Sequence, residues 1–227
     1  MAEASRLFET LREACAEEWR AYTNHPFVAG LADGSLPEAC FRHYLGQDYL
    51  FLIHFARAHA LAAYKAEDLE DIRGAAAGLT AIVDVEMGLH VEYCAGWGLG
   101  EADMKALPED SATMAYTRYV LEKGHAGDLL DLRVALAPCI VGYGEIGARL
   151  KADGDTSAAN PYAPWIEMYA SGDYQNTAVE AAGALDSLLE RRGGPGRMEG
   201  LITTFRQATR LEVDFWQMGL DATPMAE

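Results

Sequence analysis

Hydrophobic residues recur at helical spacing along almost the whole chain of 227 residues. Near the start, Phe8, Leu11, Cys15, Trp19 and Tyr22 fall on one face, and charged residues occupy the other faces. This pattern predicts one amphipathic helix. The helix should end just before the first proline of the chain, because the residue before a proline is biased away from the helical conformation.

The segment from about residue 38 to 67 is apolar almost all round, which is typical of a helix at the centre of a core. Ser35 and Glu38 frame its start as a predicted capping box, with Pro37 in the first turn. Asp128 is the predicted N-cap of another long helix. The remaining helices are predicted over residues 71–97, 108–123, 128–151, 164–169, 177–192 and 197–220.

Strand signals are nearly absent, because no run of alternating hydrophobic and polar residues stands between turn residues as a hairpin requires. The chain also shows no internal repeat and no low-complexity linker. Long helices with short connections are typical of a bundle. We therefore predict one all-α domain over residues 1–227, a multi-helix bundle of roughly seven to nine helices.

Residues 135–147 read ALAPCIVGYGEIG and weaken an otherwise favourable helical run. An interior proline costs a helix about 3 kcal/mol, and each glycine costs about 1 kcal/mol relative to alanine. We expect Pro138 to kink the helix and to turn Cys139 toward a cavity. A cysteine is a nucleophile only as a thiolate, which needs a lowered pKa or an adjacent base, and a lone cysteine is more often structural. The structural role is our expectation for the other three cysteines, Cys15, Cys40 and Cys94.

Two acidic residues stand in strongly apolar helical segments. Asp48 lies in GQDYLFLIHF, where an ionised carboxylate cannot remain without a partner. It is either paired for structural reasons or aimed into an internal pocket as a functional group. Glu212 lies in RLEVDFWQMG at the border of an apolar face, and Asp214 is a competing candidate on the other side.

Three tyrosines, Tyr116, Tyr143 and Tyr169, are further candidates for a site. Tyr143 follows Cys139 by one helical turn and therefore shares its face. A buried tyrosine usually needs a partner for its hydroxyl group, and each of the three is equally compatible with ordinary aromatic core. Beside an acid and a thiol, they would together form a stacking box for a flat heteroaromatic ligand.

The formal charge of −17 argues against nucleic acid or an anionic membrane as a partner, because both bind through clustered Lys and Arg. The cysteines form no CxxC pair, and we see no signal peptide and no long uncharged apolar span, which predicts a cytoplasmic protein. Glu86 and His90 stand one turn apart, but no second such pair supports a di-iron site. Phosphate-binding loops, dinucleotide fingerprints and nucleophile elbows are also missing, so we expect no metal and no cofactor.

Four segments resemble the TenA family, which is also known as thiaminase II or aminopyrimidine aminohydrolase. They occur in the family's order and at its intervals: HPFVAGLADGSLPEACFRHYLGQDYLFLIHFA, the segment that starts at Tyr116 and includes LAPCIVGYGEIG, PWIEMY, and LEVDFWQM. The resemblance implies an all-α, haem-oxygenase-like fold that assembles as a homotetramer. It also implies hydrolysis of 4-amino-5-aminomethyl-2-methylpyrimidine to the hydroxymethyl pyrimidine with release of ammonia, or cleavage of thiamin itself.

The resemblance assigns roles to individual residues. The family's nucleophilic cysteine falls on Cys139, its acid/base glutamate on Glu212 and its substrate-anchoring aspartate on Asp48. Because the cysteine is present, the chain resembles the cysteine-containing branch of the family.

The family's pocket tyrosines fall on Tyr116, Tyr143 and Tyr169. A further family tyrosine, one turn after the aspartate, falls on Phe51, which removes a hydroxyl group but keeps a ring for stacking. The resemblance therefore leaves one hydrogen bond to the substrate in question.

Three other functions stay open from the sequence. The same pocket would suit an enzyme that acts on a different small amine. A non-catalytic regulator is the second alternative, although the negative charge and the missing basic recognition helix argue against direct contact with DNA. A haem or di-iron oxygenase on the same fold is the third.

Overall fold

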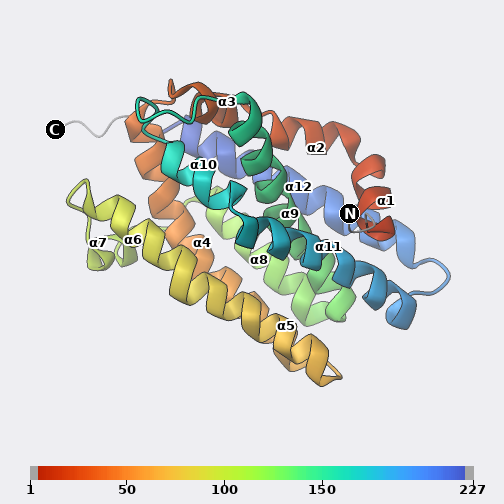
Figure 1. Cartoon of the computed structure of the whole chain (residues 1–227). Helices are drawn as coiled ribbons and strands as arrows, with labels where there is room; N and C mark the ends of the chain where they lie inside the picture. The colour runs from red at the N-terminus through yellow and green to blue at the C-terminus, as the bar shows by residue number, and fades with distance from the viewer. Residues whose placement is uncertain (1–4, 223–227) are drawn as a thin grey trace.

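A computed structural model describes residues 5–222, and every regular element within that range is a helix (Figure 1). The all-α prediction is therefore confirmed, with more elements than the predicted seven to nine. In chain order they are α1 (Arg6–Ala14), α2 (Ala16–Thr23), α3 (Pro26–Asp33), α4 (Glu38–Lys65), α5 (Leu69–Thr80), the π-helix η1 (Ala81–Glu86), α6 (Met87–Ala95), α7 (Glu101–Lys105), α8 (Ser111–Ala126), α9 (Leu129–Asp153), α10 (Ala163–Ala170), α11 (Gly172–Arg192) and α12 (Arg197–Leu220).

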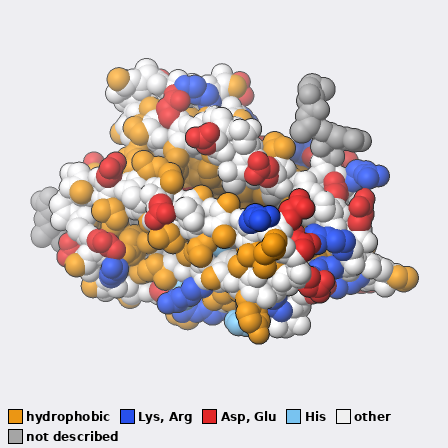
Figure 2. Space-filling view, turned by 60° about the horizontal axis from the view of Figure 1, so that its bottom comes forward, with side chains coloured by type: hydrophobic (Ala, Val, Ile, Leu, Met, Phe, Trp, Pro, Cys, Tyr) orange, Lys and Arg blue, Asp and Glu red, His pale blue; other side chains and the backbone are white. Residues whose placement is uncertain are grey.

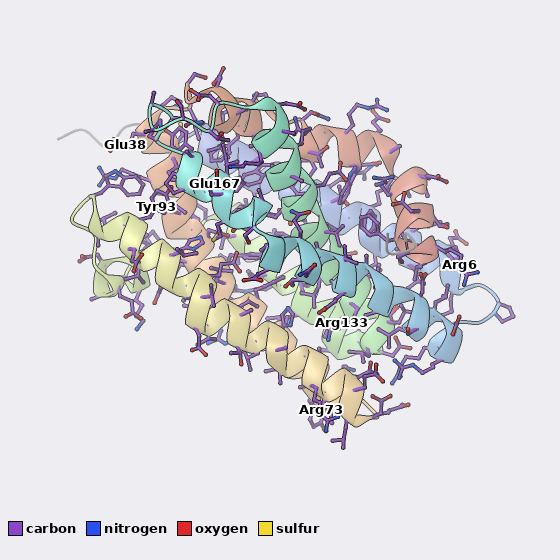
Figure 3. All side chains as sticks on the ribbon, viewed as in Figure 1. Arg6, Glu38, Arg73, Tyr93, Arg133 and Glu167 are labelled. Atoms are coloured by element: carbon purple, nitrogen blue, oxygen red, sulfur yellow. The ribbon has the colours of Figure 1, made fainter. Side chains whose placement is uncertain are left out.

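The long helices pack around α9, which contacts α8, α10, α11 and α12, while α4 packs against α5, α8 and α12. One continuous hydrophobic cluster extends through the bundle from Leu7 to Trp216, a pattern that favours a single domain. Charged side chains such as those of Arg6 and Arg73 lie at its periphery (Figure 3). The most apolar predicted helix, α4, is central, with 15 buried residues.

Two helix boundaries follow directly from local sequence. The Asp128 side chain accepts hydrogen bonds from the backbone N–H groups of Leu130 and Asp131, and the Asp131 side chain accepts one from the backbone of Asp128. This reciprocal capping box fixes the start of α9 as predicted. Helix α12 begins and ends at the predicted residues, after a Gly196 with φ of 84°.

The prediction of one first helix is wrong, because the chain leaves the helical conformation at Cys15. This residue has φ of −123° and ψ of 30°, and its backbone N–H bonds only three residues back, to Arg12. Cys15 is fully buried against α12, and the bend lets both α1 and α2 contact that helix. The hydrophobic period continues unchanged across the bend, so the pattern alone does not reveal it.

The predicted capping box of Ser35 is also wrong. The backbone N–H of Ser35 bonds to the side chain of Asp33, and Pro37 is the residue that precedes the first turn of α4. Pro37 has ψ of 135°, so the helix begins only at Glu38. The short helices α3 and α7 were not predicted.

The predicted helix over residues 71–97 is continuous but contains a π-helical turn, η1, between α5 and α6. The segment Leu69–Ala95 is long and apolar enough to span a membrane by length and composition alone, although it carries charged residues such as Asp71 and Asp84. Only 17% of its most apolar window is buried, and Leu69, Val83 and Val85 are more than half exposed. Hydrophobic side chains are spread over the face of the molecule that carries α5 (Figure 2).

Candidate active site

Cys139 lies in the middle of α9, which continues through Pro138 without interruption. The carbonyl oxygen of Pro138 accepts a hydrogen bond from the hydroxyl of Tyr22 at 3.4 Å. The following glycines provide room for neighbouring helices: a Cβ on Gly142 would lie 2.3 Å from the Tyr22 ring, and one on Gly147 would lie 2.6 Å from the backbone of Tyr169. The glycines of this segment therefore let α2 and α10 pack directly against α9.

Glu212 is buried beside Cys139, with 1% of its surface exposed. The Tyr116 hydroxyl donates a hydrogen bond of 2.7 Å to its Oε1 atom. Burial raises the pKa of Glu212 to about 8, and the negative charge of Asp48 adds to this rise, while the bond from Tyr116 opposes it. The competing candidate, Asp214, is exposed on the solvent side of α12 and takes no part in this cluster.

The thiol of Cys139 is surrounded by acidic groups. Enclosure by the surrounding protein raises its pKa well above the usual value of a cysteine, and the charges of Glu212, Glu86 and Asp48 raise it further. The resting group is therefore a neutral thiol, and it needs a proton acceptor before it can act as a nucleophile. Glu212 is adjacent and has a pKa near that of a free thiol, which suits it to this exchange.

Asp48 is held in place by two neighbours, and its side chain is almost completely buried. Its Oδ2 atom accepts a hydrogen bond of 3.2 Å from the Tyr44 hydroxyl and lies 2.6 Å from Nε2 of His90. The Tyr44 hydroxyl also lies 3.3 Å from that of Tyr143. Asp48 thus satisfies both alternatives from the sequence: it is paired, and it belongs to a cluster with potential catalytic groups.

Aromatic rings surround these groups and join them into one cluster. The ring of Phe51 lies 5.0 Å from that of Tyr116 and 5.5 Å from that of Phe215, and the rings of Tyr143 and Tyr169 are 4.8 Å apart. The structure therefore brings together all seven residues that sequence reasoning singled out, from α4, α8, α9, α10 and α12. They are Asp48, Phe51, Tyr116, Cys139, Tyr143, Tyr169 and Glu212.

Sequence reasoning missed Tyr44 and considered Glu86 and His90 only as a weak metal pair. In the structure, Tyr169 donates a 2.8 Å hydrogen bond to Oε1 of Glu86. Burial raises the pKa of Glu86, and the nearby His90 opposes that shift. Within residues 5–222, no group of three or more His, Cys, Asp or Glu side chains is arranged to hold a metal ion. The signal in the sequence for Glu86 and His90 was the presence of an acid and a histidine in one apolar segment.

These observations define a class: an all-helical bundle with a half-buried thiol, three carboxylates and a surrounding set of phenol groups. Groups of these types can serve as a nucleophile, an acid/base group and a polar anchor for a small ligand. The chain belongs to the TENA/THI-4/PQQC family, whose model matches residues 12–222.

Known proteins resemble this chain over nearly its full length. It is 38% identical over 210 residues to an aminopyrimidine aminohydrolase of Halalkalibacterium halodurans, covering 92% of this chain and 93% of that relative. A crystal structure described as a TenA family transcription regulator, from Silicibacter sp. TM1040, matches with a TM-score of 0.92 and 46% identity, covering 97% of this chain and all of that one. A domain of unknown function with a haem-oxygenase-like fold, from Shewanella denitrificans, matches with a TM-score of 0.71 over 92% of this chain and 90% of that one; at 16% identity it shows the fold alone.

Proposed function

We propose that the protein hydrolyses 4-amino-5-aminomethyl-2-methylpyrimidine to the hydroxymethyl pyrimidine and ammonia, with thiamin as a second possible substrate. The observation that carries this proposal is the grouping of Cys139, Glu212 and Asp48 inside a box of aromatic rings. The relative named aminopyrimidine aminohydrolase, which matches over nearly its whole length, supports the same reaction. The chain retains the thiol that the cysteine-containing branch requires.

Asp48 anchors the substrate in this proposal. Both contacts that Asp48 makes with Tyr44 and His90 use Oδ2, so Oδ1 is the oxygen placed to accept hydrogen bonds from the amidine edge of an aminopyrimidine. A carboxylate at that edge makes the ring more electrophilic. The rings of Tyr116 and Tyr169 flank the cluster and can stack on a flat ligand.

The covalent step begins with transfer of the Cys139 proton to Glu212 as sulfur adds to the ring carbon beside the one that bears the methylene arm. Electrons then leave through the arm, its C–N bond breaks, and Glu212 protonates the departing amine, so that ammonia leaves. Water adds to the methylene carbon, the C–S bond breaks, and the released proton returns to sulfur. Splitting one difficult displacement into two easier steps is the usual gain of covalent catalysis.

Substitution of the thiol tests this mechanism directly. We expect Cys139→Ser to lower ammonia release by at least about 10³-fold, because an alcohol is a much poorer nucleophile than a thiolate. Cys94→Ser is the matched control, since Cys94 is fully buried in α6 and belongs to no part of the site. Near-normal turnover by the Cys139 variant, in a protein with an unchanged thermal midpoint, would refute covalent catalysis.

The anchoring role of Asp48 predicts a different kinetic effect. Asp48→Asn removes the charge while keeping the size, so substrate binding should weaken and KM should rise by roughly tenfold or more. A normal KM with only a lowered kcat would contradict the anchoring role.

We also propose a cytoplasmic homotetramer. The four cysteines are free thiols, as is usual in reducing compartments. Val83, Val85 and Leu69 expose apolar surface along α5 and η1, and burial against a second copy would remove that surface from water. Light scattering should show a tetramer for the native protein and a smaller species for Val83→Asp. A native monomer at micromolar concentration would contradict the proposal.

An enzyme for another small amine, or a ligand-binding regulator, would use the same pocket. The related structure from Silicibacter is described as a transcription regulator, but the charge of −17 disfavours direct DNA binding. A panel of aminopyrimidines and unrelated amines, assayed for ammonia release, separates these possibilities.

A further inference from the structure

His90 bridges two acceptors in the interior of the molecule, where only 2% of its surface is exposed. Its Nδ1 atom lies 2.8 Å from the backbone carbonyl oxygen of Glu86, and its Nε2 atom lies 2.6 Å from Oδ2 of Asp48. The pairing joins α6 to α4 across 42 positions of sequence. The mechanism proposed above does not use His90.

The partners of the ring determine where its protons are. A carbonyl oxygen can only accept, so Nδ1 must carry a hydrogen. If Nε2 were bare, its lone pair would face the lone pairs of the Asp48 carboxylate at 2.6 Å, a repulsive contact in a buried site. A proton on Nε2 turns the same contact into a short charge-assisted hydrogen bond. The geometry therefore requires protons on both ring nitrogens when Asp48 is ionised.

We propose that His90 is a positioning residue for Asp48: as an imidazolium it binds Oδ2 and thereby orients Oδ1 toward the ligand. This inference rests on the proposed function for the identity of the ligand, but its electrostatic part concerns the free protein. Rotation of a carboxylate held at one oxygen by two donors, Tyr44 and His90, is strongly restricted. The substrate then meets an acceptor that is already oriented, which reduces the entropy cost of binding.

The charges around the pair support an imidazolium. Burial alone would lower the pKa of His90, but the hydrogen bond to Asp48 and the charges of Asp48 and Glu86 outweigh it, so the pKa is raised. Other titratable groups reach this cluster from five helices packed around it, including Tyr174 from α11. The others are Tyr116 from α8, Cys139 and Tyr143 from α9, Tyr169 from α10, and Glu212 from α12. All of these are neutral or negative, so His90 is the cation among them.

A double-mutant cycle tests the positioning role. We expect His90→Leu to lower kcat/KM by at least about tenfold in the native background, and by less than about threefold when Asp48 is already Asn. His90→Gln should recover part of the loss, because its amide can donate to Asp48. A loss of the same size in both backgrounds would overturn the proposal, because it would show that His90 acts independently of Asp48. His59→Leu is the matched control: His59 is another buried histidine, with neither ring nitrogen bonded.

Nitrogen-15 spectra of the ligand-free protein, with labelled histidine, test the protonation state without any substrate. At pH 7 we expect one histidine with protons on both ring nitrogens and assign it through its disappearance in His90→Leu. A spectrum in which the His90 ring keeps one bare nitrogen would overturn the proposal. Because this measurement requires no turnover, it also separates failure of the inference from failure of the proposed aminohydrolase activity.

Discussion

Replacement of Glu212 by glutamine should abolish activity and stabilise the protein at the same time. The wild-type side chain is 1% exposed and accepts one hydrogen bond, from Tyr116. A glutamine carbonyl can accept that same bond in the same volume. The substitution therefore removes an ionisable group from a buried site while leaving its packing and its main partner in place.

The magnitude follows from the raised pKa. A glutamate ionises near pH 4.5 when it is unperturbed, but the pKa of Glu212 in the native protein is about 8. Between these values the folded chain holds a proton that the unfolded chain has released, so the stability of the wild type falls by about 1.4 kcal/mol per pH unit. The deficit reaches about 3 kcal/mol at pH 7 and levels off above pH 8, whereas glutamine never incurs it.

Urea unfolding at pH 5, 6, 7 and 8, at one protein concentration, measures this effect. We expect the free energy of unfolding of Glu212→Gln to exceed that of the wild type by an amount that grows from about 1 kcal/mol at pH 5 to about 4 kcal/mol at pH 8. Asp214→Asn, at an exposed position two residues later on the same helix, is the control and should show no such growth. A difference that stays constant across this pH range would refute the reasoning.

Three further predictions concern other parts of the chain. The kcat/KM of the wild type should rise with pH to an apparent pKa near 8, because Glu212 accepts a proton only when ionised; a flat profile from pH 6 to 9 would contradict that role. Gly147→Ala should destabilise the protein by about 1–3 kcal/mol and raise KM, because the new Cβ would meet the backbone of Tyr169. The control Gly183→Ala places its Cβ in open space on α11 and should be neutral or stabilising in thermal denaturation. Burial lowers the pKa of His59 from 6.5 to about 3, so the wild type should lose about 2 kcal/mol of stability by pH 5. His59→Leu should not show this loss. Equal pH dependence of the two proteins in urea unfolding would exclude His59 as its cause.

The sequence predicted helix boundaries correctly where a few adjacent residues determine them. The Asp128 capping box and the glycine-rich turn before α12 gave helix starts that match the structure, because each depends on a few adjacent residues. Other boundaries depend on distant partners. The buried Gln47 of α4, for example, bonds to the backbone of Pro108 and Asp110, so α8 begins only at Ser111.

The buried acids of the site were predictable for a physical reason. A carboxylate in an apolar helix is costly to bury, so its presence indicates either a partner or a function, and Asp48 and Glu212 met that criterion in the sequence alone. Their ranking by role came from family resemblance. The aromatic residues gave a weaker signal, because tyrosines such as Tyr143 and Tyr169 also occur in ordinary hydrophobic cores. Only the hydrogen-bond partners of their hydroxyl groups distinguish them from core residues.

The spacing of residues in the sequence could not predict the contact between His90 and Asp48, and the π-helix η1 is one reason. In a regular helix, residues four apart share a face, so Glu86, His90 and Cys94 should follow one stripe. The π turn lies just before this stripe: the backbone N–H of Met87 bonds five residues back, to Ile82. A π turn adds a residue to the helix and rotates everything after it relative to α5. The directions of Glu86 and His90 therefore depend on that turn, which no hydrophobic period in this apolar segment encodes.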